Sequence, residues 1–248
     1  MARIFDNCHD MILEMDRELK LSGITTPVKH YQNIELKGDD QLTKELIGVN
    51  FIILHPLEGH VGMFTEVFGE RQVGCITRYC EQELIDRTSP FPLNPGNSWK
   101  IREDLWQKLM SRDREGKFDY TYSERIANNH QLYNVVETLK EDPNSRRAMV
   151  MIFEPEDTLK SKGASTRIPC SISYQFLIRN DKLMVLYYIR SNDYYKHFPI
   201  DIVMTSLLQE WVRNELLGTY PDLKLGSLNY FAGSLHAYKK DLDKHVVF

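Results

Sequence analysis

The sequence predicts an α+β fold whose sheet is mixed or largely antiparallel. Segments with helical periodicity dominate the first half of the chain, whereas strand-like segments gather in the second half. Two of those strands are separated only by the short polar turn at 179–182, which is typical of a hairpin. With 248 residues, 42% of them hydrophobic, and no repeat or linker, the chain is expected to form one domain over residues 1–248.

Apolar residues three and four positions apart predict the helices of the first half. The first helix is expected over residues 4–20. Two more are expected at 76–87 and 98–112, around a loop rich in proline and asparagine, and another over 124–140. The run 46–56 is dense in β-branched residues and ends in a proline, which predicts a strand.

Strand patterns account for most of the second half. Residues 146–153 form the first expected strand, and 171–178 with 183–190 form the hairpin. A helix is expected over 201–217, followed by a final strand over 224–231. Because the ends of sheet strands commonly carry functional sites, the polar residues that follow these strands are the first candidates for chemistry.

Composition argues against several classes of function. The chain has 31 Lys and Arg against 35 Asp and Glu, so it lacks the basic field that a nucleic acid partner would require. The four cysteines lack the spacings of a disulfide framework or a zinc site, so no bound metal is expected. No segment has the apolar length of a signal peptide or a membrane span. We therefore expect a cytoplasmic protein with no membrane partner.

Cys170 lies in the stretch "RIPCSISYQF", directly after a proline and at the start of a strand-like run. A cysteine in an apolar stretch is commonly buried and inert. Cys170 does not open a helix, so activation of its thiol by a helix dipole is not expected. Taken alone, it remains either a core thiol or a nucleophile that needs a partner group.

Arginines flank the expected strands. Arg146 and Arg147 begin the strand at 146–153, where adjacent side chains point to opposite faces, so at most one of them would line a pocket of the same chain. Arg190 ends the strand that pairs with the Cys170 strand. Guanidinium groups suit bidentate recognition of phosphate, although solvated surface arginines are the alternative.

Polar residues near the ends of the last strands have both structural and functional interpretations. Asn192 and Asp193 could form a turn, and Asp201 occupies the position of a helix N-cap. His236 and Tyr238, in "GSLHAY", alternate on one side of an extended segment, where a histidine is usually structural. Each of these observations is weak by itself.

The order of these motifs resembles the thymidylate synthase family. "DPNSRR", "PCSISYQF", "RSND", the aspartate eight residues after Asp193, and "GSLHAY" follow one another as they do in that family, over residues 76–240. "RSND" and "GSLH" are most similar to the branch of phage deoxycytidylate hydroxymethylases. The resemblance implies a thymidylate synthase-like fold, a large mixed sheet flanked by helices, with two chains forming a homodimer through the sheet face.

By this resemblance, Cys170 is the nucleophile that adds to carbon 6 of a pyrimidine nucleoside monophosphate. Arg190 matches the arginine that contacts the nucleotide phosphate, where its charge would lower the pKa of the thiol. Arg146 and Arg147 match a pair that the partner subunit contributes to the same phosphate. The two subunits of the dimer would therefore share their sites.

The resemblance also implies a co-substrate, 5,10-methylenetetrahydrofolate. Glu83 matches a glutamate that organises water and moves protons at the base and the folate. Trp106 and Tyr122 match positions around the folate and the catalytic waters, and Asp193 matches an aspartate that faces the pterin. The alternative for Glu83 is an exposed helical acid.

The remaining matches concern the nucleotide. Ser191 and Asn192 would line its pocket, and His236 with Tyr238 would hold the sugar 3′-hydroxyl. Asp201 stands where thymidylate synthases carry a base-reading asparagine. A carboxylate only accepts hydrogen bonds, which suits the exocyclic amine of cytosine, so the substrate is expected to be dCMP.

The expected product is 5-hydroxymethyl-dCMP, formed when water adds to a methylene group on carbon 5. The family branch favours this outcome over transfer of hydride, which would give a methyl group. The alternatives left open are a CMP hydroxymethylase, a methylase of dCMP or dUMP, and a nucleotide-binding homologue without catalysis. A phage-infected host cell is the setting that the branch implies, and a bacterial biosynthetic pathway is the other.

Several positions depart from the family pattern. Ile189 stands in place of a glutamine, and His197 in place of a glycine. The sequence ends ten residues after Tyr238, which raises the question of what covers the folate. The phosphate-binding arginine of the family's N-terminal loop has no clear counterpart, and in the stretch "TPVKHYQN" the available cations are Lys29 and His30.

Overall fold

A seven-stranded mixed sheet forms the centre of the computed structural model, which describes residues 2–162 and 166–242. The strand order is β1-β5-β9-β8-β7-β6, with β2 paired to the first residues of β5. Pairing is parallel between β1 and β5 and between β8 and β9, and antiparallel elsewhere. The strands of this sheet are β1 (Arg3–Asn7), β2 (Ile24–Pro27), β5 (Leu42–His55), β6 (Met149–Met151), β7 (Ser171–Arg179), β8 (Lys182–Asp193) and β9 (Lys224–Tyr238).

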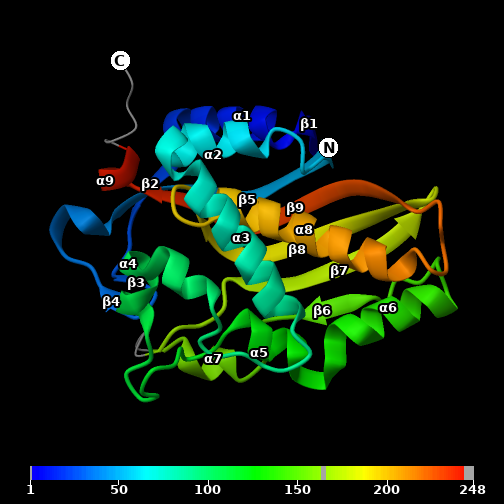
Figure 1. The fold of residues 1–248 in the computed structure, drawn as a ribbon. Coiled ribbons are helices and arrows are strands. Elements are labelled where there is room, and N and C mark those ends of the chain that lie inside the picture. The colour runs from blue at the N-terminus through cyan, green and yellow to red at the C-terminus, as the bar shows by residue number, and fades with distance from the viewer. Residues whose placement is uncertain (1, 163–165, 243–248) are drawn as a thin grey trace.

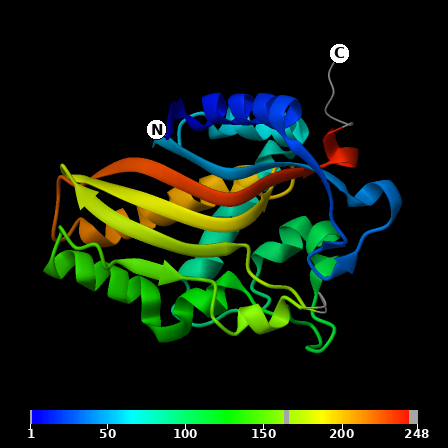
Figure 2. The ribbon, with the colours of Figure 1, turned by 180° about the vertical axis from the view of Figure 1, so that it is seen from behind.

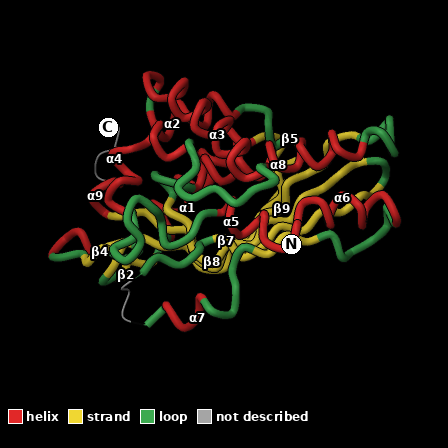
Figure 3. Tube along the Cα trace, turned by 60° about the horizontal axis from the view of Figure 1, so that its bottom comes forward, coloured by secondary structure: helices red, strands yellow, loops and turns green. Residues whose placement is uncertain are grey.

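Helices cover one face of this sheet (Figure 1). The longest, α8, buries most of its residues against β8, β9 and α3. Figure 3 shows α2, α3 and α8 gathered on the same side of the strands. The helices are α1 (Cys8–Ser22), α2 (His60–Phe68), α3 (Val73–Thr88), α4 (Glu103–Trp106), α5 (Tyr122–Ala127), α6 (Gln131–Glu141), α7 (Asp157–Lys160), α8 (Phe198–Leu216) and α9 (Lys239–Leu242). The expected α+β class, with a large mixed sheet flanked by helices, is confirmed.

In the part of the chain that the structure describes, the opposite face of the central strands carries no helix (Figure 2). Several large apolar side chains are exposed on the strands, among them Met149, Met151, Ile172 and Phe231. Tyr188 stacks on Phe231 with ring centroids 4.9 Å apart. An apolar sheet face of this kind is typical of a protein interaction surface.

The first predicted helix begins later than expected. Residues Arg3–Asn7 form β1, which pairs in parallel with β5, and the helix begins at Cys8. The Asn7 side chain accepts hydrogen bonds from the backbone N–H groups of His9 and Asp10, so it caps α1. Pairing with β5 fixes the preceding residues as a strand, and the N-cap sets the boundary.

Two other predicted helices are interrupted. The segment 98–112 consists of the 3₁₀ helix Ser98–Arg102, α4 and the 3₁₀ helix Gln107–Leu109. The segment 124–140 is divided between α5 and α6, because Asn129 and His130 have positive φ angles of 57° and 53°. L-residues in this left-handed conformation cannot continue an α-helix.

The lengths of the strands also differ from prediction. The strand expected at 146–153 is limited to β6, so Arg146 and Arg147 precede it. The last strand, β9, continues past residue 231 to Tyr238, because it pairs along its length with both β5 and β8. The hairpin of β7 and β8 is confirmed. No helix in the described ranges is long and apolar enough to cross a membrane.

A small hairpin lies outside the central sheet. Strands β3 (His30–Tyr31) and β4 (Ile34–Glu35) pair with each other, and Gln32 at its tip has a φ angle of 53°. The backbone carbonyl of Asn33 accepts a hydrogen bond from Arg112. Positive φ at a residue other than glycine is uncommon and is often found where a side chain has a functional position.

Candidate active site

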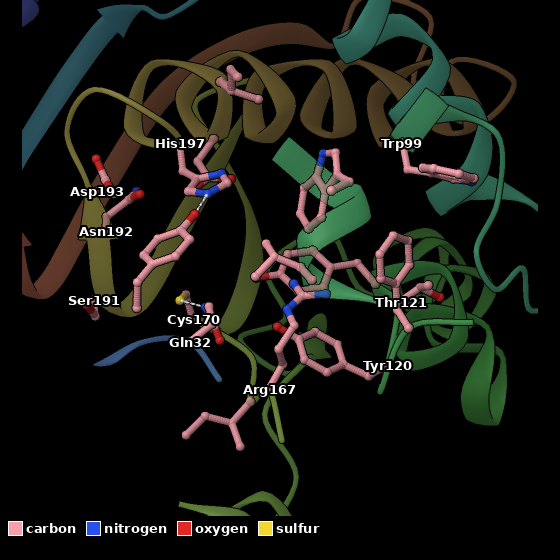
Figure 4. A pocket seen from close by; sticks show the side chains of 18 of the residues that line it. Gln32, Trp99, Tyr120, Thr121, Arg167, Cys170, Ser191, Asn192, Asp193 and His197 are labelled. Atoms are coloured by element: carbon pink, nitrogen blue, oxygen red, sulfur yellow. Dashed lines mark hydrogen bonds between the residues drawn. The ribbon is translucent and has the colours of Figure 1, made fainter. Parts of the chain in front are cut away.

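A pocket of about 510 Å³ opens where the ends of β8 and β9 meet the start of α8. Its other walls come from α3, the β3–β4 hairpin and the segments around residues 95 and 120. Most of the residues singled out from the sequence line it: Glu83, Trp106, Tyr122, Cys170, Arg190, Ser191, Asn192, Asp193, His197, Asp201, His236 and Tyr238. Positions far apart in the sequence therefore meet in one cavity (Figure 4).

Cys170 lies at the foot of this pocket, immediately before β7. Its thiol receives a hydrogen bond from the Gln32 side chain, with Nε2 and Sγ 3.4 Å apart, and Arg190 Nη2 lies 3.7 Å from the same sulfur. Arg190 Nε also donates to the Pro169 carbonyl at 2.8 Å. The guanidinium is thus held against the loop that carries the cysteine, with two donors directed at the sulfur.

Opposing influences act on the Cys170 thiol. Burial raises its pKa above the ordinary value, and Asp201 adds to this, whereas Arg190, Arg167 and the Gln32 hydrogen bond lower it. By comparison, burial raises the pKa of Cys8 and of Cys80 to about 12, and neither lines the pocket. Cys170 has two neighbouring cations and a position in the pocket, which is the setting that a nucleophilic thiol requires.

Asp201 belongs to the first turn of α8 and faces the pocket. It is not the N-cap, because the helix begins at Phe198 with His197 as its N-cap, and the Asp201 N–H already donates to the His197 carbonyl at 2.8 Å. Burial raises the pKa of its carboxyl to about 7, although Arg87 and a hydrogen bond from Asn192 oppose the rise. Asp201 can therefore be either protonated or ionised near neutral pH.

Glu83 is part of a buried network on α3. One carboxylate oxygen accepts from Arg87 Nε at 2.8 Å, and the other accepts from the Ser98 hydroxyl. Arg87 is also buried, donates to the Tyr174 hydroxyl at 3.3 Å, and lies over the Tyr122 ring. The alternative of an exposed helical acid is wrong for Glu83, since its carboxylate is fixed in the pocket wall.

The Asp193 carboxylate already interacts with two residues close to it in the sequence, Tyr195 and Lys196. Its carboxylate accepts the backbone N–H groups of Tyr195 and Lys196 at 3.1 and 3.2 Å, and Lys196 Nζ at 2.8 Å. The same Lys196 Nζ also pairs with Asp241 at 2.7 Å. A pterin that approached Asp193 would share this carboxylate with Lys196, so the predicted pterin contact remains a prediction.

His236 and Tyr238 lie on β9, and Ser191 lies on the neighbouring strand β8, opposite Ser234. The Nδ1 atom of His236 is 3.5 Å from the hydroxyls of both Ser191 and Ser234. Burial lowers the pKa of His236, with partial opposition from Asp193 and Glu45, so the ring is neutral at pH 7. A neutral imidazole can both donate and accept, which is the property needed to hold a hydroxyl group.

His197 contacts the hairpin that approaches the pocket. Its Nε2 lies 3.0 Å from the Tyr31 hydroxyl, and its ring is tilted against Trp106 at 5.9 Å. Burial lowers the pKa of His197 well below its usual value, with nearby Arg102 and Lys196 acting in the same direction. The neutral ring can therefore accept a hydrogen bond from the Tyr31 hydroxyl. This contact connects the β3–β4 hairpin to the start of α8.

Three of the other four cations predicted from the sequence lie apart from this cavity. Arg146 and Arg147 are exposed and do not line the pocket of their own chain. Lys29 also lies outside it, whereas His30 reaches its lining. The expectation that at most one of the paired arginines faces a pocket of the same chain is consistent with this placement.

Sequence reasoning missed several residues of the pocket. Tyr31, Gln32, Arg87 and Arg167 all line it. Gln32 and Tyr31 are brought there by the hairpin, and Arg87 lies one helical turn after Glu83, so the spacing of that pair was a usable signal. Arg167 had a signal too, since it precedes Cys170 by three residues.

The aromatic side of the pocket suits a flat heterocycle. Trp99 and Trp106 line it, and each has a buried indole N–H without a hydrogen-bond partner in the described part of the chain. Phe118 packs edge-on against both rings, at 6.2 and 5.7 Å. Unpaired buried donors beside aromatic walls fit a ring system that carries acceptor atoms, as a reduced folate does.

Comparison with known proteins gives a consistent result. The sequence model described as thymidylate synthase matches residues 97–246. A protein of Methanosarcina mazei named "Putative thymidylate synthase" is 32% identical over 160 residues, which is 63% of this chain and 70% of that protein. Its namesake in Methanosarcina barkeri is 30% identical over 145 residues, 57% of this chain and 63% of the relative.

A bacterial relative is matched over a shorter region. The thymidylate synthase of Mycoplasma genitalium is 32% identical over 114 residues, covering 46% of this chain and 37% of that enzyme. The chain thus spans from about two fifths to about two thirds of the length of these relatives. The matched half contains Cys170, Arg190, Asp201 and His236.

Proposed function

Because this chain belongs to the thymidylate synthase family, we propose that it transfers a one-carbon unit from methylenetetrahydrofolate to carbon 5 of a pyrimidine nucleotide. The preferred substrate in this proposal is dCMP, and the product is 5-hydroxymethyl-dCMP. The observation that carries the proposal is Asp201, a carboxyl with a pKa of about 7 in the same pocket as Cys170.

Asp201 supports cytosine because of what the base edge offers. Cytosine presents an amine donor beside the N3 acceptor, and a protonated carboxyl can accept from the amine with one oxygen while donating its proton to N3. The Asn192 side chain hydrogen-bonds to Asp201, and its Nδ2 also donates to the Tyr230 hydroxyl at 3.1 Å. A proton delivered to N3 draws electron density from the ring, which favours attack at carbon 6.

Cys170 would perform that attack. Its sulfur forms a bond to carbon 6, and the displaced electron pair makes carbon 5 nucleophilic toward the methylene carbon of the co-substrate. Carbon 5 then loses its proton, the bond between the methylene carbon and the folate nitrogen breaks, and tetrahydrofolate leaves. Water adds to the exocyclic methylene, the thiol is expelled, and the ring regains its aromatic form.

The side chains around Cys170 have corresponding roles. Arg190 would bind the nucleotide phosphate and stabilise the thiolate, since its Nη2 is directed at the sulfur. Glu83, held by Arg87 and Ser98, would position water and move protons at the base. Trp106 and Tyr122 would contact the folate or its waters, and His236 with Tyr238 would hold the sugar.

A second candidate is methylation of dUMP, which the names of the relatives favour. The test is incubation of the protein with dCMP, dUMP or CMP plus methylenetetrahydrofolate, followed by mass spectrometry of the nucleotide. A hydroxymethyl group on dCMP supports the proposal, and a methyl group on dUMP supports the second candidate. An unchanged nucleotide in all three reactions would favour a binding protein without catalysis.

We also propose that two copies of the chain form a homodimer with shared sites. The helix-free sheet face carries exposed apolar residues, and Arg146 and Arg147 are exposed near its edge without a role in their own pocket. Mixing inactive Cys170→Ala chains with inactive Arg147→Ala chains tests this arrangement. Shared sites predict that the mixture recovers part of the activity, whereas sites built from single chains predict none.

A further inference from the structure

Arg167 is a buried cation that has no anionic partner among the described residues. Its side chain is directed into the pocket from the loop before Cys170 (Figure 4), and only 6% of the residue is exposed. Within residues 2–162 and 166–242, its Nε atom has no hydrogen-bond partner and no carboxylate forms an ion pair with it. The nearby Asp119 carboxylate accepts the backbone N–H of Arg167 at 2.8 Å.

The other buried arginines are satisfied within the fold. Arg87 pairs with Glu83, and Arg125 pairs with Asp157 at 2.7 Å and also with Glu154. Burial of a guanidinium without an anion is unfavourable, so such a group is usually paired. Arg167 is the exception among the three arginines that are buried in the described residues.

Aromatic rings hold the guanidinium in place. Its central carbon lies 5.1 Å from the ring centroid of Trp106, 5.1 Å from that of Tyr120 and 5.5 Å from that of Phe118. Contacts of this kind offset part of the cost of burying a cation and orient it, but they leave the Nε–H group without an acceptor in the described residues. The guanidinium is therefore fixed in position with hydrogen-bond donors available to a ligand.

We propose that Arg167 is a ligand-binding residue that takes an oxyanion in the pocket, at a subsite additional to that of Arg190. This rests on the proposed function, because the two anionic groups that such a pocket would receive are the phosphate of the nucleotide and a glutamyl carboxylate of the folate. Both are planar or tetrahedral oxyanions that a guanidinium binds with paired hydrogen bonds. Arg167 would therefore raise the affinity of the pocket for a ligand that carries an oxyanion.

The test compares ligand pairs that differ only in the anion. Binding of dCMP against 2′-deoxycytidine reports the phosphate, and binding of tetrahydrofolate against its glutamyl diamide reports the carboxylates. Both pairs are titrated into wild type, Arg167→Met and Arg190→Met by calorimetry. Arg167→Met should reduce the advantage of one anionic ligand by roughly 10- to 100-fold, and the pair affected identifies the source.

Arg190→Met is the matched control, since it should reduce the phosphate advantage and leave the carboxylate advantage intact. A third titration does not depend on the proposed function: inorganic phosphate should raise the Tm of Arg190→Met, and the rise should disappear when Arg167→Met is added. The proposed subsite is supported if Arg167→Met loses any one of three effects: the phosphate advantage, the carboxylate advantage, or the rise in Tm caused by inorganic phosphate. Retention of all three would overturn it, even if the enzyme proves to act on another nucleotide.

Folding of the variant is controlled by a second comparison. Because Arg167 has no anion to release, Arg167→Met should keep or raise the Tm, and Arg167→Lys should keep part of the anion effect. A large fall in the Tm of Arg167→Met would show that the arginine is a structural group of the apo protein and would contradict the proposal.

Discussion

Two clusters of ionisable side chains in this molecule differ in whether their members have partners of opposite charge within the fold. Arg125, Asp157 and Glu154 form a closed group in which each charge has an opposite partner. In the pocket, Arg167 is buried and Cys170 and Asp201 are half-buried, and these groups are not neutralised in the same way. The pKa values of Cys170 and Asp201 are raised, and the Nε donor of Arg167 has no partner in the described residues. The first cluster stabilises the fold, whereas the side chains of the second cluster line the cavity and can interact with a ligand there. Substitutions should therefore reduce stability in one cluster and function in the other.

The largest expected effect concerns Cys170. Cys170→Ala removes the only proposed nucleophile, so turnover should fall by a factor on the order of a million. Binding of the nucleotide should remain within a fewfold of wild type, because the phosphate and sugar contacts are unchanged. Product formation and calorimetric titration with dCMP measure the two quantities, and substantial residual turnover would rule out covalent catalysis by this residue.

Arg125→Met tests the closed cluster. It leaves Asp157, which has no exposed surface, as a buried carboxylate without its arginine, and the free energy of unfolding should fall by about 3–5 kcal/mol. Denaturant unfolding of this variant and of Arg167→Met gives the direct contrast. Equal losses of stability would remove the distinction between the two clusters.

Asp201→Asn should change which base is preferred. An amide can match the N–H and carbonyl edge of uracil, so the ratio of kcat/KM for cytidylate over uridylate should fall by roughly 5- to 150-fold. Competition between dCMP and dUMP in one reaction measures the ratio. If the preference is unchanged, a different residue reads the base.

The effect that is smallest per pH unit is a pH dependence of stability. Burial raises the pKa of Asp201 in the folded protein from 3.8 to about 7, so the folded state binds this proton more tightly than the unfolded state does. Between about pH 4 and 7 the free energy of unfolding should therefore decrease as pH rises, by at most about 1.4 kcal/mol per pH unit. Asp201→Asn should lack this contribution, and parallel slopes for the two proteins would contradict the assignment.

The same contrast explains how much could be predicted from sequence. Cys170, Arg190, Asp201 and His236 are placed by strands and by the start of α8, whose periodicity is visible in the sequence, and all of them reach the pocket. The local prediction that Asp201 is a helix N-cap was wrong, because α8 begins at Phe198, three residues before Asp201. Its carboxyl therefore lines the cavity.

The remaining parts of the site depend on tertiary contacts. Gln32 reaches Cys170 from a hairpin 138 positions away in the sequence, and no local pattern indicates that contact. Arg167 has the same local sequence whether or not an acid lies beside it, so only the folded structure reveals that its charge is unpaired. The interruption of the predicted helix at 124–140 by Asn129 and His130 was likewise invisible to periodicity.

In the proposed reaction, Cys170 and Asp201 direct a hydroxymethyl group to dCMP. The most direct measurement is mass spectrometry of the nucleotide after reaction with methylenetetrahydrofolate in water enriched in heavy oxygen. We expect dCMP to gain one CH₂O unit whose oxygen carries the label from water, with wild type but not with Cys170→Ala. A gain of a methyl group without labelled oxygen, or modification of dUMP in preference to dCMP, would contradict it.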